Sequence, residues 1–145
     1  VFDARGNDFV LKTTFKNEIK SGTQQCQDAI VTIECQTFNF IIHFTQTGCQ
    51  KFAELTLGTE YYSGIQNDLT NLALNMNEWQ NLTFSSKEGK FTIYNGEKKL
   101  IEKEYTESPG TITMLQFSFR GNGMVDDILL KNEKGEVAYF ENFEE

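Results

Sequence analysis

The sequence has few of the residues on which several functional classes depend. Its 145 residues include one histidine, one proline and one tryptophan, and 13 Lys and Arg stand against 21 Asp and Glu, for a formal net charge of −8. The basic residues are scattered along the chain. Because phosphate backbones are bound through clustered positive charge, we expect no nucleic-acid partner. With a single histidine and no Gly-x-Ser-x-Gly motif, we also expect no serine- or cysteine-based nucleophilic site.

Long hydrophobic runs are absent as well. No stretch approaches the ~18 consecutive apolar residues of a membrane-spanning helix, so we expect no membrane insertion within this chain. No charged segment followed by an apolar one opens the sequence, as it would in a signal peptide. The chain starts at Val1 in the middle of what reads as folded sequence, which we interpret as a cut inside a longer precursor.

The three cysteines allow at most one internal disulfide. Their spacing matches no zinc pattern, and His43 has no second ligand group nearby. Cys35 lies on the apolar face of the expected strand 31–35, so we predict a buried free thiol. Cys26 and Cys49 flank the two strands between them, and we predict that they form the disulfide. A disulfide favours an exported protein.

Apolar residues alternate with polar ones along nearly the whole chain, which is the period of half-buried β-strands. Glycines stand between these segments, and no proline interrupts one. A dozen or so short strands with no alternating helices predict one domain over residues 1–145, an all-β, two-sheet antiparallel sandwich. The expected strands include residues 9–15, 31–35, 38–44, 53–57, 80–84, 91–94, 98–101, 115–119, 128–130 and 137–139.

Three local signals refine this outline. Asn95-Gly96 predicts a type I′ hairpin. The segment 87–90 predicts a second tight turn. Residues 67–76 have helical spacing but contain Asp68 and three asparagines, which favour caps and turns, so we expect a loop with at most one helical turn.

From Trp79 onward, the order of the elements resembles the concanavalin A-like lectin/glucanase jelly rolls, a superfamily that includes laminin-G-like and pentraxin-like domains. The resemblance implies a jelly-roll sandwich in which the early strand 8–15 lies beside the last one and Trp79 packs in the core. Within the superfamily, the chain looks closest to small uncharacterised bacterial cell-envelope domains. The features that carry the resemblance are Trp79 before Leu82 and Phe84, Tyr94 before the Asn95-Gly96 hairpin, Gly110-Thr111-Ile112, and Val125-Asp126-Asp127-Ile128-x-Leu130.

The superfamily contains glucanases, whose chemistry needs two carboxylates facing each other across a cleft. In those enzymes acidic residues alternate along one strand as Glu-x-Asp-x-x-Glu, and this chain has no such run. Glu102 and Glu104 alternate, but we interpret them as an exposed strand face. Asp126 and Asp127 are adjacent, so they point to opposite faces of a strand. We therefore expect no enzyme, and a glycoside hydrolase is the least favoured function.

Calcium is the one cofactor that the sequence brings into consideration. The oxygen ligands would come from Asn122, Asp126 and Asp127, which lie near two glycines. The alternative, which we favour, is an aspartate that accepts backbone N–H bonds and fixes a turn.

A sugar platform requires exposed aromatic rings with polar groups close by. We select Tyr61 and Tyr62, with Asn67 and Asp68 as the polar neighbours, and we expect Tyr94 to pack across its hairpin. The tyrosines considered were Tyr61, Tyr62, Tyr94 and Tyr105.

The resemblance and these tyrosines lead to one expected function and one alternative. The first is a non-catalytic recognition module that binds a glycan outside the cytoplasm, in the periplasm, at the cell surface or after secretion. The alternative is a structural or protein-interaction domain of a larger envelope protein, whose partner is another envelope protein.

Overall fold

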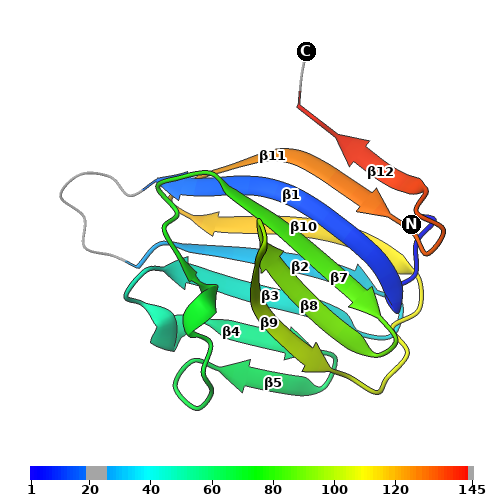
Figure 1. The fold of residues 1–145 in the computed structure, drawn as a ribbon, viewed down its shortest axis with the longest axis horizontal. Coiled ribbons are helices and arrows are strands. Elements are labelled where there is room, and N and C mark those ends of the chain that lie inside the picture. Colours follow the sequence, from blue (N-terminus) through cyan, green and yellow to red (C-terminus); the bar gives the residue numbers. More distant parts are fainter. Residues whose placement is uncertain (19–25, 144–145) are drawn as a thin grey trace.

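The computed structural model describes residues 1–18 and 26–143, which form two β-sheets packed face to face (Figure 1). Within each sheet all strand pairs are antiparallel, except that β6 pairs in parallel with β3. The predicted all-β, two-sheet sandwich is confirmed. Sheet A has the order β12 (Val137–Glu141), β11 (Asn122–Lys131), β1 (Asp8–Glu18), β7 (Gln80–Lys87), β8 (Lys90–Asn95), β9 (Lys98–Glu104). Sheet B has the order β10 (Ile112–Arg120), β2 (Asp28–Cys35), β3 (Asn39–Gln46), β4 (Glu54–Leu57), β5 (Glu60–Ser63), with β6 (Ala73–Leu74) beside β3.

Two 3-10 turns, η1 (Gln50–Phe52) and η2 (Thr70–Leu72), are the helical elements among the described residues. The expectation of at most one helical turn within residues 67–76 is confirmed by η2. No helix in the described part of the chain has the length and apolar character needed to cross a membrane.

Phenylalanine rings join the two sheets. The alternation of each strand sends one set of side chains inward, and the inward sets meet as aromatic pairs. The ring of Phe9 on β1 lies 5.6 Å from Phe40 on β3, and Phe40 stacks on Phe91 of β8 at 4.8 Å. Phe15 on β1 lies 5.6 Å from Phe44 on β3. Each such pair adds about 0.5–1.5 kcal/mol beyond the area that it buries, so these contacts fix how the sheets sit on each other.

The position of β1 differs by one strand from the prediction. It pairs with β11 and β7, and the last strand, β12, lies outside β11 at the edge of the sheet. The reason is the hairpin that ends the described chain. Asn132 Oδ1 accepts hydrogen bonds from the N–H groups of Lys134 and Glu136 at 3.0 Å each, which folds β12 back onto β11.

The two predicted turns exist, but the type of the turn at Gly96 differs from the prediction. Asn95 pairs with Lys98, so the central residues between β8 and β9 are Gly96 and Glu97, and only Gly96 has a positive φ, at 61°. That is the pattern of a type II′ turn, and the I′ prediction was wrong. Between β7 and β8, both central residues, Glu88 and Gly89, have positive φ, as a type I′ turn requires.

Trp79 lies opposite to its prediction, and Tyr105, one of the four candidate tyrosines, is buried. Trp79 is 44% exposed, and Lys16 Nζ lies 5.0 Å from its ring centre, so the prediction of a core tryptophan was wrong. The cause is strand parity. Gln80 and Leu82 point inward from β7, and the residue before Gln80 therefore faces out. Tyr105 is only 7% exposed, and its hydroxyl bonds the Ser86 hydroxyl within the core.

Candidate functional site: the outer face of sheet B

The side chains that point away from the core on sheet B line up in rows across its strands, and we call this surface the sheet B outer face. The rows follow from the register of the sheet, which places residues from distant parts of the sequence beside one another. From one end of the sheet to the other, the rows are Arg120–Asp28–Thr45, then Ser118–Ile30–His43–Glu54–Ser63, then Gln116–Thr32–Ile41–Thr56–Tyr61, then Met114–Glu34–Asn39.

At the first end of the sheet B outer face, Asp28 contacts His43 and Arg120, and we call these three residues the hub. The side chain of Asp28 is 13% exposed and takes part in two hydrogen bonds and one longer ion pair. The backbone N–H of Arg120 donates to Oδ1 at 3.1 Å, and Arg120 Nε lies 3.8 Å from Oδ2. His43 Nε2 lies 3.2 Å from the same Oδ2. Because a carboxylate only accepts hydrogen bonds, Nε2 carries the proton in this contact, which fixes the orientation of the imidazole ring.

This hub is supported from the opposite sheet. Asn17 on β1 is fully buried, and its Nδ2 donates to the backbone carbonyls of Asp28 at 2.8 Å and of Arg120 at 2.6 Å. Those two residues face each other across β2 and β10. A buried carbonyl without a partner costs about 1–3 kcal/mol. Asn17 therefore holds together the strand ends from which the Asp28 and Arg120 side chains emerge.

A disulfide forms the wall beside the hub. Cys26 is bonded to Cys49, with a Cα–Cα distance of 6.0 Å, which is the pairing predicted from the sequence. The bond ties the start of β2 to η1, and η1 ends in Phe52, whose side chain is 49% exposed. Together with the hub, these groups enclose an open hollow of about 440 Å³, which we call the Asp28 hollow. Its lining residues are Cys26, Asp28, His43, Thr45, Phe52, Glu54 and Arg120.

The four residues selected as a sugar platform separate in the structure. Tyr61 is 57% exposed, pairs with Thr56, and belongs to the sheet B outer face. Partial desolvation, with the negative charge of Glu54 and a hydrogen bond to it, raises the pKa of the Tyr61 phenol. Tyr62 turns the other way and packs against the core. Lys103 Nζ lies 4.7 Å from the Tyr62 ring.

Asn67 and Asp68 are used within their own loop. Asn67 Oδ1 accepts the N–H of Ser63 at 3.1 Å, and Asp68 Oδ1 accepts the N–H of Thr70 at 3.2 Å. The hydrogen bonds from Thr70 lower the pKa of Asp68. Of the predicted group, only Tyr61 lies on the sheet B outer face.

The three predicted calcium ligands do not converge. Asn122 and Asp126 both lie on β11, four residues and therefore about 13 Å apart along the strand, whereas ligands of one calcium ion lie about 2.3–2.6 Å from it. Asp126 Oδ1 accepts the N–H of Asp127 at 3.0 Å, and Asp127 has a φ of 52° at a bulge against β1. Asp126 therefore accepts a backbone N–H within its own strand, which is the alternative to calcium binding stated from the sequence. No group of three or more His, Cys, Asp or Glu suited to a metal occurs in residues 1–18 and 26–143.

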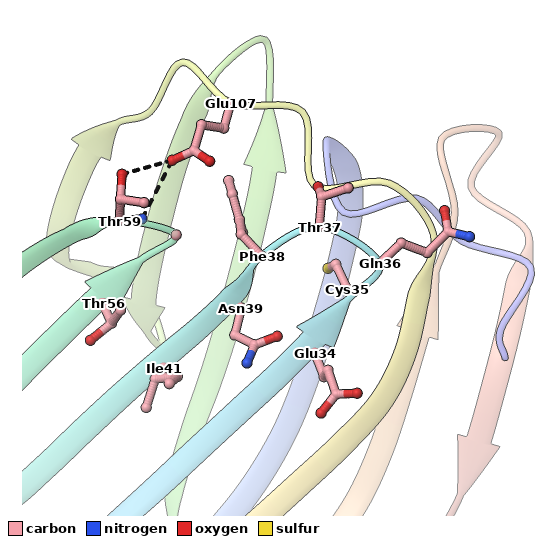
Figure 2. Close-up of a pocket in the computed structure, with 11 residues that line it drawn as sticks. Glu34, Cys35, Gln36, Thr37, Phe38, Asn39, Ile41, Thr56, Thr59 and Glu107 are labelled. Atoms are coloured by element: carbon pink, nitrogen blue, oxygen red, sulfur yellow. Dashed lines mark hydrogen bonds between the residues drawn. The ribbon is translucent and has the colours of Figure 1, made fainter.

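A second hollow lies at the other end of the sheet B outer face. It measures about 420 Å³, and we call it the Glu107 hollow. Figure 2 shows the side chains of Glu34, Asn39 and Thr56 rising from three neighbouring strands, with Glu107 and Thr59 above them. Glu107 Oε1 accepts both the hydroxyl of Thr59 at 2.9 Å and its N–H at 3.4 Å.

The thiol beneath this second hollow is protected. Cys35 is 5% exposed, and burial, with the negative charge of Glu34, raises the pKa of its thiol to about 12. A thiol with such a pKa carries almost no thiolate near neutral pH, so Cys35 is a packing residue. The structure thus places the free thiol in the core, where the strand pattern predicted it.

Comparison with solved structures finds lectin-type sandwiches among the similar chains. The carbohydrate-binding module CBM66 of Bacillus subtilis superposes with a TM-score of 0.56, over 88% of this chain and 77% of its own, at 9% sequence identity. The fold is a lectin-type jelly roll. The galectin LEC-6 of Caenorhabditis elegans superposes with a TM-score of 0.53, over 87% of this chain and 84% of its own, at 16% identity. Comparison of the sequence with protein-family models and with curated proteins gave no match. The predicted concanavalin A-like architecture is confirmed at the level of the fold.

Sequence reasoning missed the residues at the centre of the site. Asp28, His43 and Arg120 come from three strands, and only the register of sheet B brings them together. Each stands at an outward position of its strand, which the alternation indicates for His43, whereas Asp28 and Arg120 lie beyond the strand ends predicted from the sequence. What the sequence could not provide is the pairing of β2 with β10, which are far apart along the chain.

Proposed function

We propose that this protein is a non-catalytic recognition module that binds carbohydrate on the sheet B outer face, at the Asp28 hollow. The observation that carries the proposal is the charged hub inside an open hollow next to an exposed aromatic ring. The two lectin-type structures with the same fold support it. One of them is a carbohydrate-binding module, and the other is a galectin.

The chemistry of the hollow fits a sugar. Sugars present hydroxyl groups, which donate and accept hydrogen bonds, and C–H faces, which pack on aromatic rings. Arg120 supplies N–H donors with a side chain that is 65% exposed. Glu54, which pairs with His43 across β3 and β4, supplies an acceptor within the same hollow. The exposed ring of Phe52 supplies the apolar contact. The Asp28 carboxylate holds His43 and Arg120 in place in the free protein, which reduces the ordering cost of binding.

The charge of the surface selects among glycans. Within the described rows of the sheet B outer face, Asp28, Glu34 and Glu54 stand against one arginine, Arg120. The chain as a whole carries a net charge of −8. A surface of this sign repels carboxylated or sulfated sugars, so uncharged glycans are the proposed ligand class.

We propose binding without catalysis because the carboxylates are engaged by other groups of the protein. A glycoside hydrolase needs one carboxyl group kept as an acid opposite a second carboxylate. Asp28 instead accepts the backbone N–H of Arg120 at 3.1 Å and contacts His43 Nε2 at 3.2 Å, so its oxygens are already engaged within the protein. The alternating pair Glu102 and Glu104 lies exposed on β9, and Glu102 pairs with Lys99 at 3.3 Å. We therefore propose hydrogen bonding and stacking as the whole activity.

We place the protein outside the cytoplasm because of the Cys26–Cys49 bond. Disulfides persist in oxidising compartments and are rare in the cytosol. Reducing cytosolic conditions would open this bond and release η1, and with it Phe52, from the wall of the hollow.

A glycan array of the purified protein, run with calcium and with chelator, tests the proposal. We expect binding to uncharged glycans in both buffers, because the hub needs no metal. Asp28→Asn should abolish the signal, since the neutral amide lacks the charge that attracts Arg120 and has one acceptor oxygen in place of two. Glu102→Gln is the matched control on sheet A and should bind like the wild type. A blank array, or equal loss in both variants, would contradict the proposal, and binding only with calcium would restore a role for the metal.

A second candidate function rests on the opposite edge of the molecule. The edge strand β12 and the residues after it expose Val137, Phe140 and Phe143 by 58%, 56% and 53%. Exposed apolar side chains on an edge strand are typical of a surface that pairs with another chain. This is the alternative of a structural or interaction domain in a larger envelope protein. Cross-linking in intact cells, compared between wild type and Phe140→Ser, tests it, and an unchanged pattern would count against it.

A further inference from the structure

The sheet B outer face has a hollow at each of its two ends, and β2 connects them. Asp28 lies in the first hollow and Glu34 in the second. Both side chains point outward from the same strand, six residues and so about 20 Å apart. A single sugar ring cannot touch both groups. The two hollows are therefore parts of one long surface or two separate sites.

The surface between the hollows favours one long binding surface over two separate sites. The middle row consists of Gln116, Thr32, Ile41, Thr56 and Tyr61. Thr32, Ile41 and Thr56 are small or medium side chains and half-buried, so they form a low floor. Ile41 and Thr56 also line the Glu107 hollow, which makes the floor continuous with that end. Tyr61 stands at the side of the floor on β5, exposed and fixed by Glu54.

The far hollow offers its own polar groups to a ligand. Glu107 is held in position by Thr59, as in Figure 2. The side-chain amide of Asn39 points off the same face, and Figure 2 shows no hydrogen bond from it to the other residues drawn. The Glu34 carboxylate receives the Thr113 hydroxyl at 3.3 Å and retains acceptor capacity. These are the donors and acceptors that a second region of a sugar chain requires.

We infer that the sheet B outer face binds an extended, unbranched, uncharged oligosaccharide that spans both hollows, rather than one terminal sugar. This inference rests on the proposed function, because it assigns the length of the ligand bound by the same face. Units in the Asp28 hollow contact Phe52 and the hub. Units farther along contact Asn39 and Glu34.

Calorimetric titration with oligosaccharides of increasing length tests the inference. The probes are linear oligomers of glucose, galactose, mannose, fructose and N-acetylglucosamine, each with one, two, four and six units. For the sugar that binds, we expect affinity to rise by about tenfold or more between two and six units, since several hydrogen bonds of modest strength are added. Equal affinity for two and six units would overturn the inference.

Variants at the two ends separate this inference from the proposed function. Asn39→Ala should lower the affinity for six units by about threefold to tenfold, the value of one hydrogen bond, and leave the affinity for two units unchanged. His43→Ala should weaken both. Asn81→Ala, on β7 of sheet A, is the matched control and should change neither. If two units bind through His43 and extra units add nothing, the proposed function stands and this inference fails. If no oligomer binds, both fail.

A second measurement does not depend on the variants. In amide NMR spectra of the wild type, two units should shift the signals near His43 and Phe52. Six units should shift these and also the signals of Asn39 and Thr59. Identical shifts with both lengths would overturn the inference.

Discussion

The two outer faces of the sandwich differ in how their polar groups are held. On sheet B, Asp28 is 13% exposed, receives donors from His43 and Arg120, and rests on a buried asparagine from the other sheet. On sheet A, the corresponding surface carries Lys12, Thr14 and Asn81 around a hollow of about 560 Å³. Its polar side chains meet in single contacts, such as the Thr14 hydroxyl to Asn81 at 2.7 Å and Lys16 Nζ to Glu18 at 2.8 Å.

The contrast supports the sheet B outer face as the proposed recognition surface. Burying a carboxylate is costly unless it is paired, and a sandwich needs no such group for its stability. A charged hub held from both sheets on one face, and absent among the described residues of the other, indicates a requirement beyond folding. Four changes test this difference between the two outer faces, and the change with the largest expected effect comes first.

Removing the disulfide should have the largest effect. The double change Cys26→Ser and Cys49→Ser opens a loop with a sequence separation of 23, and the free energy of unfolding should fall by about 3 kcal/mol. Glycan binding should weaken as well, because η1 and Phe52 lose their anchor. Urea unfolding and the array measure the two effects. Wild-type stability and binding in the double variant would contradict this role.

Asn17→Ala should follow, because it leaves two buried carbonyls, those of Asp28 and Arg120, without their donor. We expect a loss of about 2 kcal/mol in unfolding free energy, together with weaker glycan binding. The matched control is Asn81→Ala on the outer face of sheet A, where the change should stay within about 0.5 kcal/mol. If chemical unfolding shows the same loss of unfolding free energy in both asparagine variants, the proposed difference between the two faces is wrong.

Asp28→Asn should affect binding more than stability. The amide keeps the shape of the side chain, but it no longer attracts His43 and Arg120 as a charge, so we expect a stability loss of about 1 kcal/mol and at least a tenfold loss in affinity. Asp127→Asn is the matched change on sheet A. Asparagine tolerates the positive φ of that position, which is 52°. If Asp28→Asn and Asp127→Asn lose the same affinity for the glycan, the ligand does not bind at the Asp28 hollow.

The smallest effect concerns the buried thiol and appears only at high pH. The pKa of Cys35 is raised from 9.0 to about 12, so the folded state keeps its proton while the unfolded state loses it. The stabilising contribution is therefore complete below pH 9 and is lost as the pH rises toward 12. Unfolding free energy measured across this range should decline less steeply in Cys35→Ala than in the wild type. Parallel declines would show that the thiol does not take part.

Much of the fold follows from the sequence because strand alternation is a local property. The inward set of β1, with Phe9 and Phe15, can be read directly, and so can the turn at Glu88 and Gly89. The register of a hairpin is less local. Asn95 became a strand residue because it pairs with Lys98, which moved the turn by one position and changed its type.

The site was far less predictable, because its residues meet through long-range pairing. The sequence directed attention to Tyr61 and Tyr62 as a pair, but adjacent strand residues face opposite ways, and only Tyr61 reached the surface that we propose. His43 is not selected as a site residue from the sequence, because no second metal-ligand group lies near it along the chain. In the fold, its partner Asp28 comes from the neighbouring strand.

An NMR titration of the labelled protein with the uncharged glycan selected by the array tests the central claim most directly, because it observes both faces in one experiment. If the glycan binds at the Asp28 hollow, the amide signals of that hollow shift with saturation, and those of the sheet A outer face stay in place. The first group is Asp28, His43, Glu54 and Arg120, and the second is Lys12, Thr14 and Asn81. Shifts confined to the sheet A residues would contradict the account, as would the absence of any shift.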